Sequence, residues 1–153
     1  MVWKYLGIDP GKNGGIALLF DREVVTVRMP GTPADVMVWI RSFCDDCIAC
    51  MEQVSGYAGE GQPGSAMFNF GRGYGNLEAF LLACDVPFEL VPPRRWQKAM
   101  GITPKGKTET KTEWKNRIKA TAQRLFPAEK VTLMTADALL IAEYCRRKHR
   151  GRL

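Results

Sequence analysis

A turn rich in glycine and proline, set between two short apolar runs, most constrains how this chain folds. The runs cover residues 2–9 and 14–20, and the first of them ends on Asp9. Proline and glycine end a strand and let the chain reverse its direction. A second tight turn leads from the later run into residues 23–30. This part of the sequence therefore predicts three consecutive antiparallel strands with short connections.

Helical and extended segments alternate along the rest of the chain. Apolar residues at helical spacing predict helices, whereas short apolar runs closed by polar residues or proline predict strands. These patterns give a helix at 33–45, a strand at 47–54, a loop at 55–64, a helix at 65–84, a strand at 88–93, a short helix or turn from 94, a polar and mobile loop at 103–110, and helices at 114–126 and 135–148. The element order predicts an α/β fold, in which helices flank a mixed five-stranded sheet.

Local signals add detail to three of the predicted helices. Thr135 is a suitable N-cap for the last helix. Gly71 and Gly75 lie four residues apart, so they share a helix face and would allow close packing against a neighbour. The penultimate helix is amphipathic, and its expected buried face consists of Trp114, Ile118, Ala122 and Leu125.

The composition is that of one globular domain, which we expect to span residues 1–153. Hydrophobic residues make up 46% of the chain and charged residues 25%, which is typical of a soluble fold. No apolar stretch approaches the roughly 18 residues that cross a bilayer, and the first residues lack the layout of a signal peptide. The five cysteines are odd in number and do not suggest a secreted disulfide framework. We therefore expect a cytoplasmic protein with reduced thiols and no membrane partner.

Positive charge is concentrated in the C-terminal part of the chain. Residues 92–153 contain 16 of the 22 lysines and arginines and only five acidic residues, which is a formal net charge of +11. The remainder carries −5, because the whole chain carries +6. Clustered lysine and arginine displace counterions from a phosphate backbone. The distribution favours a nucleic-acid partner over the alternative of a solvated basic helix surface.

Three carboxylates stand among apolar neighbours at the ends of predicted elements. Asp9 ends the first strand, Glu52 lies at the end of the fourth, and Asp137 lies in the first turn of the last helix. Each has a structural alternative: an Asx-turn for Asp9, loop amides for Glu52 and the helix dipole for Asp137. If the three converge, however, they bind a hard divalent cation through oxygen. Beside a basic surface, such a site predicts metal-assisted phosphodiester cleavage.

A family resemblance rests on five segments, which occur in this order along the chain: GIDPGKNGGIA, MEQVSGYAGEGQPGSAMFNFGRGYG, ELVPPRRWQKAMG, KNRIKATAQRLFP and TADALLIAEY. They resemble the corresponding segments of RuvC-type Holliday junction resolvases, above all the small phage and prophage members. The resemblance covers nearly the whole chain. It implies a ribonuclease H-like fold, a homodimer, dependence on Mg²⁺ or Mn²⁺, and paired symmetric nicking of four-way junctions or other branched DNA. A phage-encoded member would act in the cytoplasm of its bacterial host.

The same resemblance implies roles for individual residues. Asp9, Glu52 and Asp137 match the catalytic acids of the first strand, the fourth strand and the last helix, so they are expected to hold the metal. Lys111 and Lys115, near the start of the penultimate helix, are expected to touch the scissile phosphate or a neighbouring one. Their structural alternative is a solvated helix face.

Further DNA contacts are expected from one aromatic residue and from the basic segments. Tyr57, in the loop after the fourth strand, is the expected wedge, because stacking on an unpaired base is worth roughly 1–3 kcal/mol. Phe68 and Phe70 follow that loop, and we interpret them as core or dimer-interface residues. The expected DNA-binding residues are Tyr57, Arg94, Arg95, Lys105, Lys107, Lys111 and Lys115.

One position departs from the family pattern. The cellular members carry another aspartate three residues before the last catalytic acid, where this chain has Met134. Three carboxylates leave room for water and phosphate oxygens on a metal, but they also weaken the case for a second metal ion. A ribonuclease H-like module that binds branched DNA and cuts poorly is therefore the second hypothesis. Actin-like sugar kinases share the opening strand–turn–strand motif, but the chain is too short for their two lobes.

Two other patterns suggest ligand sites that we do not favour. Cys44, Cys47 and Cys50 recur every three residues, but a four-thiolate metal site lacks an adjacent fourth cysteine. We interpret these cysteines as small buried residues. The glycine-rich turn after Asp9 lacks the Gly-Lys-Ser/Thr ending of a phosphate-binding loop, and no helix follows it.

Overall fold

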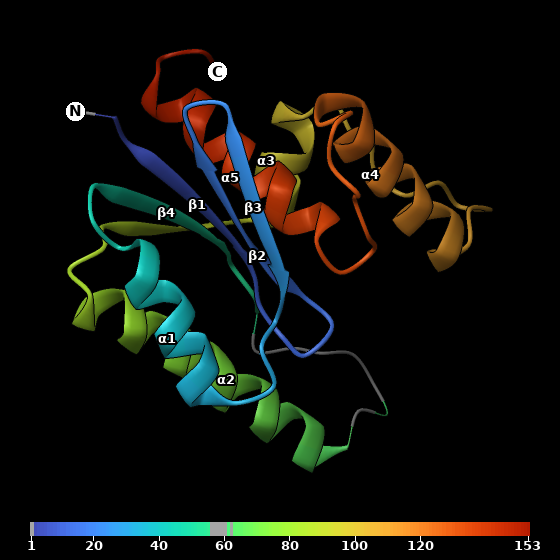
Figure 1. Ribbon diagram of the computed structural model, residues 1–153. Coiled ribbons are helices and arrows are strands. Elements are labelled where there is room, and N and C mark those ends of the chain that lie inside the picture. The colour runs from blue at the N-terminus through green and yellow to red at the C-terminus, as the bar shows by residue number, and fades with distance from the viewer. Residues whose placement is uncertain (1, 56–60, 62) are drawn as a thin grey trace.

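A five-stranded mixed sheet forms the centre of the computed structural model, which describes residues 2–55, 61 and 63–153 (Figure 1). The strands are β1 (Lys4–Asp9), β2 (Gly15–Phe20), β3 (Glu23–Arg28), β4 (Cys47–Glu52) and β5 (Phe88–Val91). They are ordered β3-β2-β1-β4-β5. β1, β2 and β3 pair antiparallel, whereas β4 pairs parallel with β1 and with β5. The parallel pairing puts the carboxyl ends of β1, β4 and β5 at the same end of the sheet.

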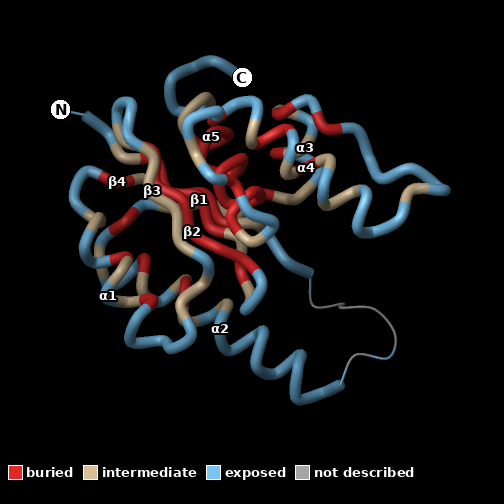
Figure 2. The backbone as a smooth tube through the Cα atoms, turned by 45° about the vertical axis from the view of Figure 1, so that its right-hand side comes forward, coloured by how far each residue is buried: buried red, intermediate tan, exposed pale blue. Residues whose placement is uncertain are grey.

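Helices cover both faces of this sheet (Figure 1). They are α1 (Pro33–Phe43) and α2 (Gly64–Ala83) on one face, and α3 (Pro93–Ala99), α4 (Lys111–Leu125) and α5 (Ala136–His149) on the other. Figure 2 shows that the buried part of the chain runs through the central strands and α5. None of the described helices has both the length and the apolar character needed to cross a bilayer.

The alternation of side chains along β1 separates two hydrophobic cores. Leu6 and Ile8 belong to the core under α1 and α2, whereas Tyr5 belongs to the core around α5. Successive side chains of a strand point to opposite faces, so Gly7 and Asp9 share the face of Tyr5. This alternation places Asp9 on the side of the sheet that α5 covers.

α5 is the central helix of the second core. All residues from 136 to 145 are buried, so neighbours surround the helix instead of covering one stripe. Gly7 permits this packing, because a Cβ atom there would collide with the backbone of Ala138. Gly15 does the same for the turn before α5, since its Cβ would lie 2.5 Å from the carbonyl oxygen of Met134. The two glycines let the start of α5 lie directly on β1 and β2.

The structure confirms the predicted α/β class and the predicted order of strands and helices. The short segment from 94 is helical and forms α3. α4 begins three residues before its predicted start, because Thr110 and Glu113 form a capping box. The Thr110 hydroxyl accepts a hydrogen bond from the Glu113 amide at 3.1 Å, and the Glu113 carboxylate accepts one from the Thr110 amide at 2.7 Å.

Two predicted details are wrong, and one is confirmed only in part. Thr135 occupies the N-cap position of α5, as predicted, but its side chain makes no capping hydrogen bond, and its hydroxyl instead accepts one from the amide of Thr132. Gly71 and Gly75 face open space, since a Cβ atom at either position would meet none of the described residues within 4 Å. Leu125 is 40% exposed, and the neighbouring Phe126 enters the core in its place.

Candidate active site

Asp9 and Glu52 lie next to each other at the carboxyl ends of two neighbouring strands. The parallel register of β1 and β4 pairs Ile8 with Met51, and the next residue of each strand is one of the two acids. Alternation along each strand places both carboxylates on the sheet face that α5 covers. The parallel pairing of β1 with β4 therefore brings two of the three predicted acids together.

Asp137 approaches the same place from α5. It lies in the first turn of that helix and is only 6% exposed. The close packing at Gly7 and Gly15 holds this end of α5 on β1 and β2. Asp9 interacts electrostatically with both Asp137 and Glu52. We call these three carboxylates, Asp9, Glu52 and Asp137, the acidic cluster.

Burial and mutual repulsion make the acidic cluster difficult to ionise. Burial raises the pKa of Asp9 to about 8, and the nearby charges of Asp137 and Glu52 contribute to the rise. Burial also raises the pKa of Glu52 and that of Asp137 above their usual values. Buried carboxylates that repel one another attract a cation, and such perturbed groups concentrate at functional sites.

Lys115 supplies positive charge to the acidic cluster. Its Nζ lies 3.3 Å from Oδ2 of Asp137. Burial alone would lower the pKa of Lys115, but the charges of Asp137 and Asp9 raise it above its usual value. Lys115 is therefore protonated at neutral pH and offsets part of the negative charge.

Trp96 is a site residue that sequence reasoning missed. Its side chain is fully buried in the core between α3 and the sheet. The indole Nε1 donates a hydrogen bond of 2.9 Å to Oε2 of Glu52. This bond opposes the effect of burial on the pKa of Glu52 and fixes the orientation of its carboxylate. A tryptophan inside an otherwise basic segment was the signal that was available in the sequence.

The donor chemistry of the acidic cluster fits a hard divalent cation. Carboxylate oxygens are the ligands that Mg²⁺ and Mn²⁺ prefer. Oδ1 of Asp137 is buried and has no hydrogen-bond partner among the described residues, which leaves that oxygen available to a ligand. Within the described residues, however, no three His, Cys, Asp or Glu side chains are grouped closely enough to hold a metal ion, so a bound cation would require these carboxylates to move closer together.

The remaining residues predicted to bind DNA are either exposed or lie outside the described residues. The exposed ones are Arg94, Arg95, Lys105, Lys107 and Lys111. Lys111 lies one turn before Lys115 on α4, so the two share a face of that helix. Tyr57, the expected wedge, lies outside the described residues.

Phe68 and Phe70 were interpreted as core or dimer-interface residues. The first of these interpretations is wrong, because neither residue lies in the core. They lie in the first half of α2 and are 68% and 36% exposed. The Phe70 ring stacks on that of Tyr74, with 6.3 Å between ring centroids. It also lies close to Gly11, where an added Cβ atom would come within 2.9 Å of the ring. The first half of α2 is therefore exposed next to the turn that follows Asp9.

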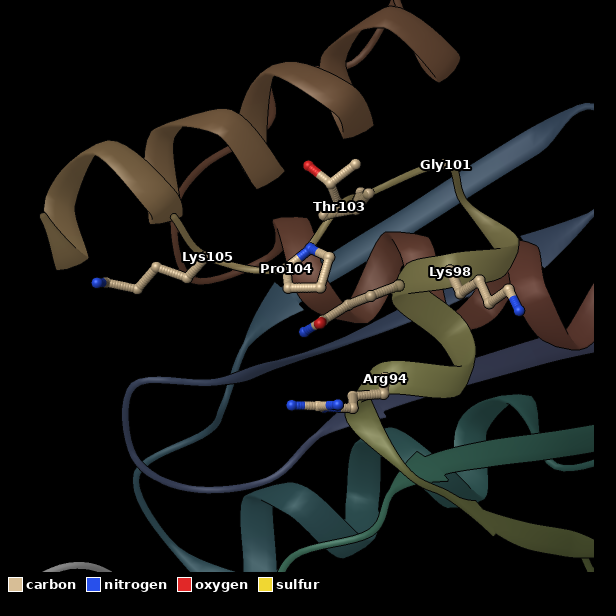
Figure 3. A pocket seen from close by; sticks show the side chains of 8 residues that line it. Arg94, Lys98, Gly101, Thr103, Pro104 and Lys105 are labelled. Carbon is tan, nitrogen blue, oxygen red and sulfur yellow. The ribbon is translucent and has the colours of Figure 1, made fainter. Parts of the chain in front are cut away.

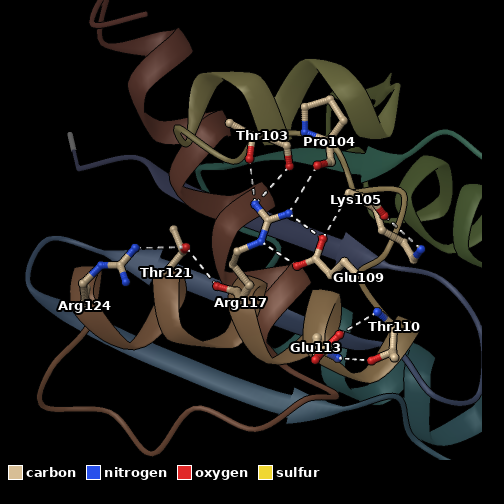
Figure 4. Close-up of polar contacts among 10 residues, drawn as sticks. Thr103, Pro104, Lys105, Glu109, Thr110, Glu113, Arg117, Thr121 and Arg124 are labelled. Carbon is tan, nitrogen blue, oxygen red and sulfur yellow. Dashed lines mark hydrogen bonds and ion pairs between the residues drawn. The ribbon is translucent and has the colours of Figure 1, made fainter.

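The loop before α4 is fastened to that helix by one arginine (Figure 4). The Arg117 guanidinium donates a hydrogen bond of 2.9 Å to each carboxylate oxygen of Glu109. It also donates to the carbonyl and hydroxyl of Thr103 and to the carbonyl of Pro104. The bonds from Arg117 and from the Gly106 amide lower the pKa of Glu109 to about 2. The loop was expected to be mobile, but this Arg117 network gives it a defined hydrogen-bonded path.

Two of the three cysteines that recur every three residues are buried, as we expected. Cys47 and Cys50 are buried, and Cys44 is half-buried. Burial raises the pKa of Cys47 to about 12, so its thiol is protonated and unreactive at neutral pH. The Cys50 thiol donates a hydrogen bond of 3.3 Å to Oε1 of Glu89.

The sheet order, with helices on both faces, defines a ribonuclease H-like α/β fold. Two similar solved structures are both of RuvC from Thermus thermophilus. The first, a complex with a Holliday junction substrate, has a TM-score of 0.63, and the second has one of 0.56. In each case the identity is 14%, and the match covers 97% of this chain and 97% of the other. At this identity the likeness establishes the fold.

No protein-family model and no curated protein matches this sequence.

Proposed function

We propose that this protein is a metal-dependent endonuclease that resolves Holliday junctions or other branched DNA by paired symmetric nicks. The observation that carries the proposal is the position of Asp9 and Glu52 at neighbouring strand ends, where Asp9 also interacts electrostatically with Asp137. The net charge of +11 in residues 92–153 supports a nucleic-acid substrate. The fold adds support, because a similar structure was determined in complex with a Holliday junction.

In this proposal the acidic cluster holds Mg²⁺ or Mn²⁺ through its carboxylate oxygens. The metal would activate water for attack on a phosphodiester and stabilise the leaving oxygen. Trp96 holds the Glu52 carboxylate in one orientation through its indole N–H. The burial of Asp137 in the first turn of α5 limits the access of bulk water to the site.

Lys115 and Lys111 act on the phosphate side of the proposed site. The side chain of Lys115 is 39% exposed, so its ammonium faces Asp137 and is also open to solvent. We propose that it contacts the scissile phosphate or a neighbouring one, and that Lys111 extends the positive face of α4. Further DNA contacts come from Tyr57 and from the basic residues Arg94, Arg95, Lys105 and Lys107.

A homodimer suits this activity. Two active sites related by a two-fold axis match the two equivalent strands that a symmetric resolvase cuts. In the proposal, residues 1–153 form the single nuclease domain of each protomer, and Phe68 and Phe70 are available for the interface. We further propose that the chain is a small, phage-like member of the RuvC type that acts in the cytoplasm of a bacterial host.

A cleavage assay tests the proposal directly. A labelled four-way junction and a linear duplex of the same length are incubated with Mg²⁺, with Mn²⁺ or with chelator. We expect symmetric nicks in the junction that require the metal and disappear in Asp9→Asn. The matched control is Asp45→Asn, at an exposed aspartate outside the acidic cluster. Cleavage in chelator, equal cutting of the linear duplex, or full activity in Asp9→Asn would contradict the proposal.

Met134 favours a second candidate function, that of a branched-DNA-binding module that cuts poorly. This position lacks the carboxylate that the resemblance leads one to expect, and no complete metal ligand set is present among the described residues.

Met134→Asp tests this alternative. Under the nuclease proposal, the change lowers the Mg²⁺ concentration needed for cleavage on the order of tenfold, which is about 1.4 kcal/mol of binding. Leu133→Asp, at the exposed neighbouring position, should have no such effect. Tight junction binding without nicks by either protein, under any metal, supports the binding module instead.

A further inference from the structure

A hollow of about 670 Å³ lies between the outer face of α3 and the segment that follows it (Figure 3). Arg94 and Lys98 line it from α3, and Lys105 lines it from the opposite wall. The apolar part of the lining consists of the exposed Pro104 and of Ile102, which is itself buried. Every charged side chain of its lining is basic. The hollow therefore selects for negative charge.

The cations of this hollow lie at its two ends. Figure 3 shows that the side chains of Arg94 and Lys105 extend toward one side, whereas Lys98 extends toward the other. Within the described residues none of the three forms a salt bridge. The Lys105 ammonium donates only one long hydrogen bond, 3.4 Å to the carbonyl of Gly106. All three charges are free to bind a ligand.

This layout suits an extended polyanion better than a single phosphate. A compact anion reaches the cations at one end only, but a chain of phosphates reaches both ends. Pro104 is the exposed apolar residue of the same lining, against which the sugar of a nucleotide would lie.

The hydrogen bonds of Arg117 hold in place the segment that forms one wall of this hollow. Arg117 binds the carbonyls of Thr103 and Pro104 and the hydroxyl of Thr103, and these two residues also line the hollow. Glu109 pairs with the Arg117 guanidinium at 2.9 Å, so this arginine is committed to the fold. A wall that is fixed before binding reduces the entropy lost on ordering.

α3 connects the hollow to the acidic cluster. Arg94 and Lys98 lie four residues apart and share the outer face of the helix. Trp96, on the inner face, is fully buried and donates its hydrogen bond to Glu52. A strand held on the outer face is therefore held at a fixed position relative to Glu52.

We propose that this hollow binds the sugar–phosphate backbone of one DNA strand, as a contact separate from the acidic cluster. This inference rests on the proposed function, because it states where an arm of branched DNA is held. It adds Lys98 to the expected DNA contacts and unites Arg94 with Lys105 in one site, which Arg95 and Lys107 do not line.

The test measures binding of the full chain to a four-way junction, in chelator, across a range of salt concentrations. The test variant is the triple change Arg94→Gln, Lys98→Gln and Lys105→Gln. Each phosphate contact contributes about −0.9 to the slope of log K against log salt concentration. We therefore expect the slope to become shallower by roughly 2–3 and the affinity to fall accordingly. The matched control removes three exposed arginines elsewhere, in the triple change Arg22→Gln, Arg41→Gln and Arg152→Gln.

A second measurement locates the contact on the DNA. Junction phosphates are replaced one at a time by uncharged methylphosphonates. With the wild-type protein, single replacements at two or three consecutive phosphate positions of one arm should each weaken binding. With the hollow variant, those same replacements should have no further effect, while replacements near the crossover keep theirs. Thermal melting of both triple variants within a few degrees of wild type excludes misfolding as the cause.

The outcomes separate this inference from the proposed function. If the wild-type protein binds the junction but the hollow variant keeps the same affinity and salt slope, the inference is wrong and the proposed function stands. An equal loss in the control variant also overturns the inference, because the effect would then come from net charge alone. If the wild-type protein shows no salt-dependent junction binding, both proposals are overturned.

Discussion

The metal-free fold does not fully compensate the negative charge that Asp9 carries when it is ionised. Its burial and the charges of Asp137 and Glu52 raise its pKa from 3.8 to about 8. Between these two pH values the native state binds more protons than the unfolded state, so the free energy of unfolding falls as the pH rises. A bound divalent cation would offset this loss with its own charge. The residue that the proposed chemistry needs most therefore destabilises the protein without metal.

Asp9→Asn removes this charge and keeps the size of the side chain. We expect its melting temperature in chelator near pH 8 to exceed that of the wild type, by roughly 2–4 °C for each kcal/mol gained. The difference should shrink as the pH falls toward 4, because the carboxyl of the unfolded wild-type chain then also becomes protonated and folding no longer requires the uptake of a proton. Calorimetry across this pH range is the measurement, with Asp45→Asn as the exposed control. A variant that melts below the wild type near pH 8 would contradict the assignment of a buried, poorly compensated charge.

Trp96→Phe tests the orientation of Glu52. The change removes the 2.9 Å hydrogen bond to Oε2 of Glu52 and keeps an aromatic ring in the core. We expect cleavage to need roughly 10–100-fold more Mg²⁺, which is the usual effect of losing a partner that orients a metal ligand. The smaller ring also lowers stability through the cavity it leaves. Ile118→Val is therefore the control, because it perturbs the same core without touching Glu52, and it should leave the metal requirement unchanged.

The elements themselves are largely predictable because their signals are local. Alternating and helical apolar spacing determine most strand and helix positions, and the structure places them in the expected order. The true start of α4 also has a local signal in the sequence, the Thr110–Glu113 capping box. The hydrogen bonds that order the loop before α4 could not be predicted from local patterns, because Arg117 and Thr103 lie 14 residues apart in the sequence. That contact depends on the direction in which α4 leaves the loop, which local spacing does not encode.

Arg117→Lys tests whether the loop before α4 is ordered by geometry or by charge. Lysine keeps the charge but cannot form the fork that Arg117 uses on Glu109, Thr103 and Pro104. We expect faster amide hydrogen exchange over residues 103–109 and roughly threefold to tenfold weaker junction binding, as losing about 1 kcal/mol predicts. Arg124→Lys, also on α4, is the matched control. Unchanged exchange and binding in Arg117→Lys would show that charge alone orders the loop.

At the scale of the whole molecule, the sequence identifies the candidate acids but not the residues that support them. Asp9 and Glu52 follow from two strand ends, once the parallel pairing of β1 with β4 brings those ends together. The bond from Trp96 to Glu52 joins residues 44 positions apart, and only the packing of α3 on the sheet produces it. Charge segregation is visible in the sequence, but the hollow on α3 is a property of the folded surface.

The proposed homodimer predicts that paired cutting of the two strands requires an intact active site in each protomer. Wild-type and Asp9→Asn chains carrying different tags are produced together, and dimers that contain one of each are isolated by both tags. Because each protomer of the proposed dimer cuts one strand, we expect mixed dimers to leave junctions with a single nick instead of two separated duplexes. Mixed dimers of wild type with Asp45→Asn should cut both strands, which controls for the tags and the purification. Paired nicks from the Asp9→Asn mixture, or tags that never purify together, would show that the two cuts do not come from two protomers acting as one dimer.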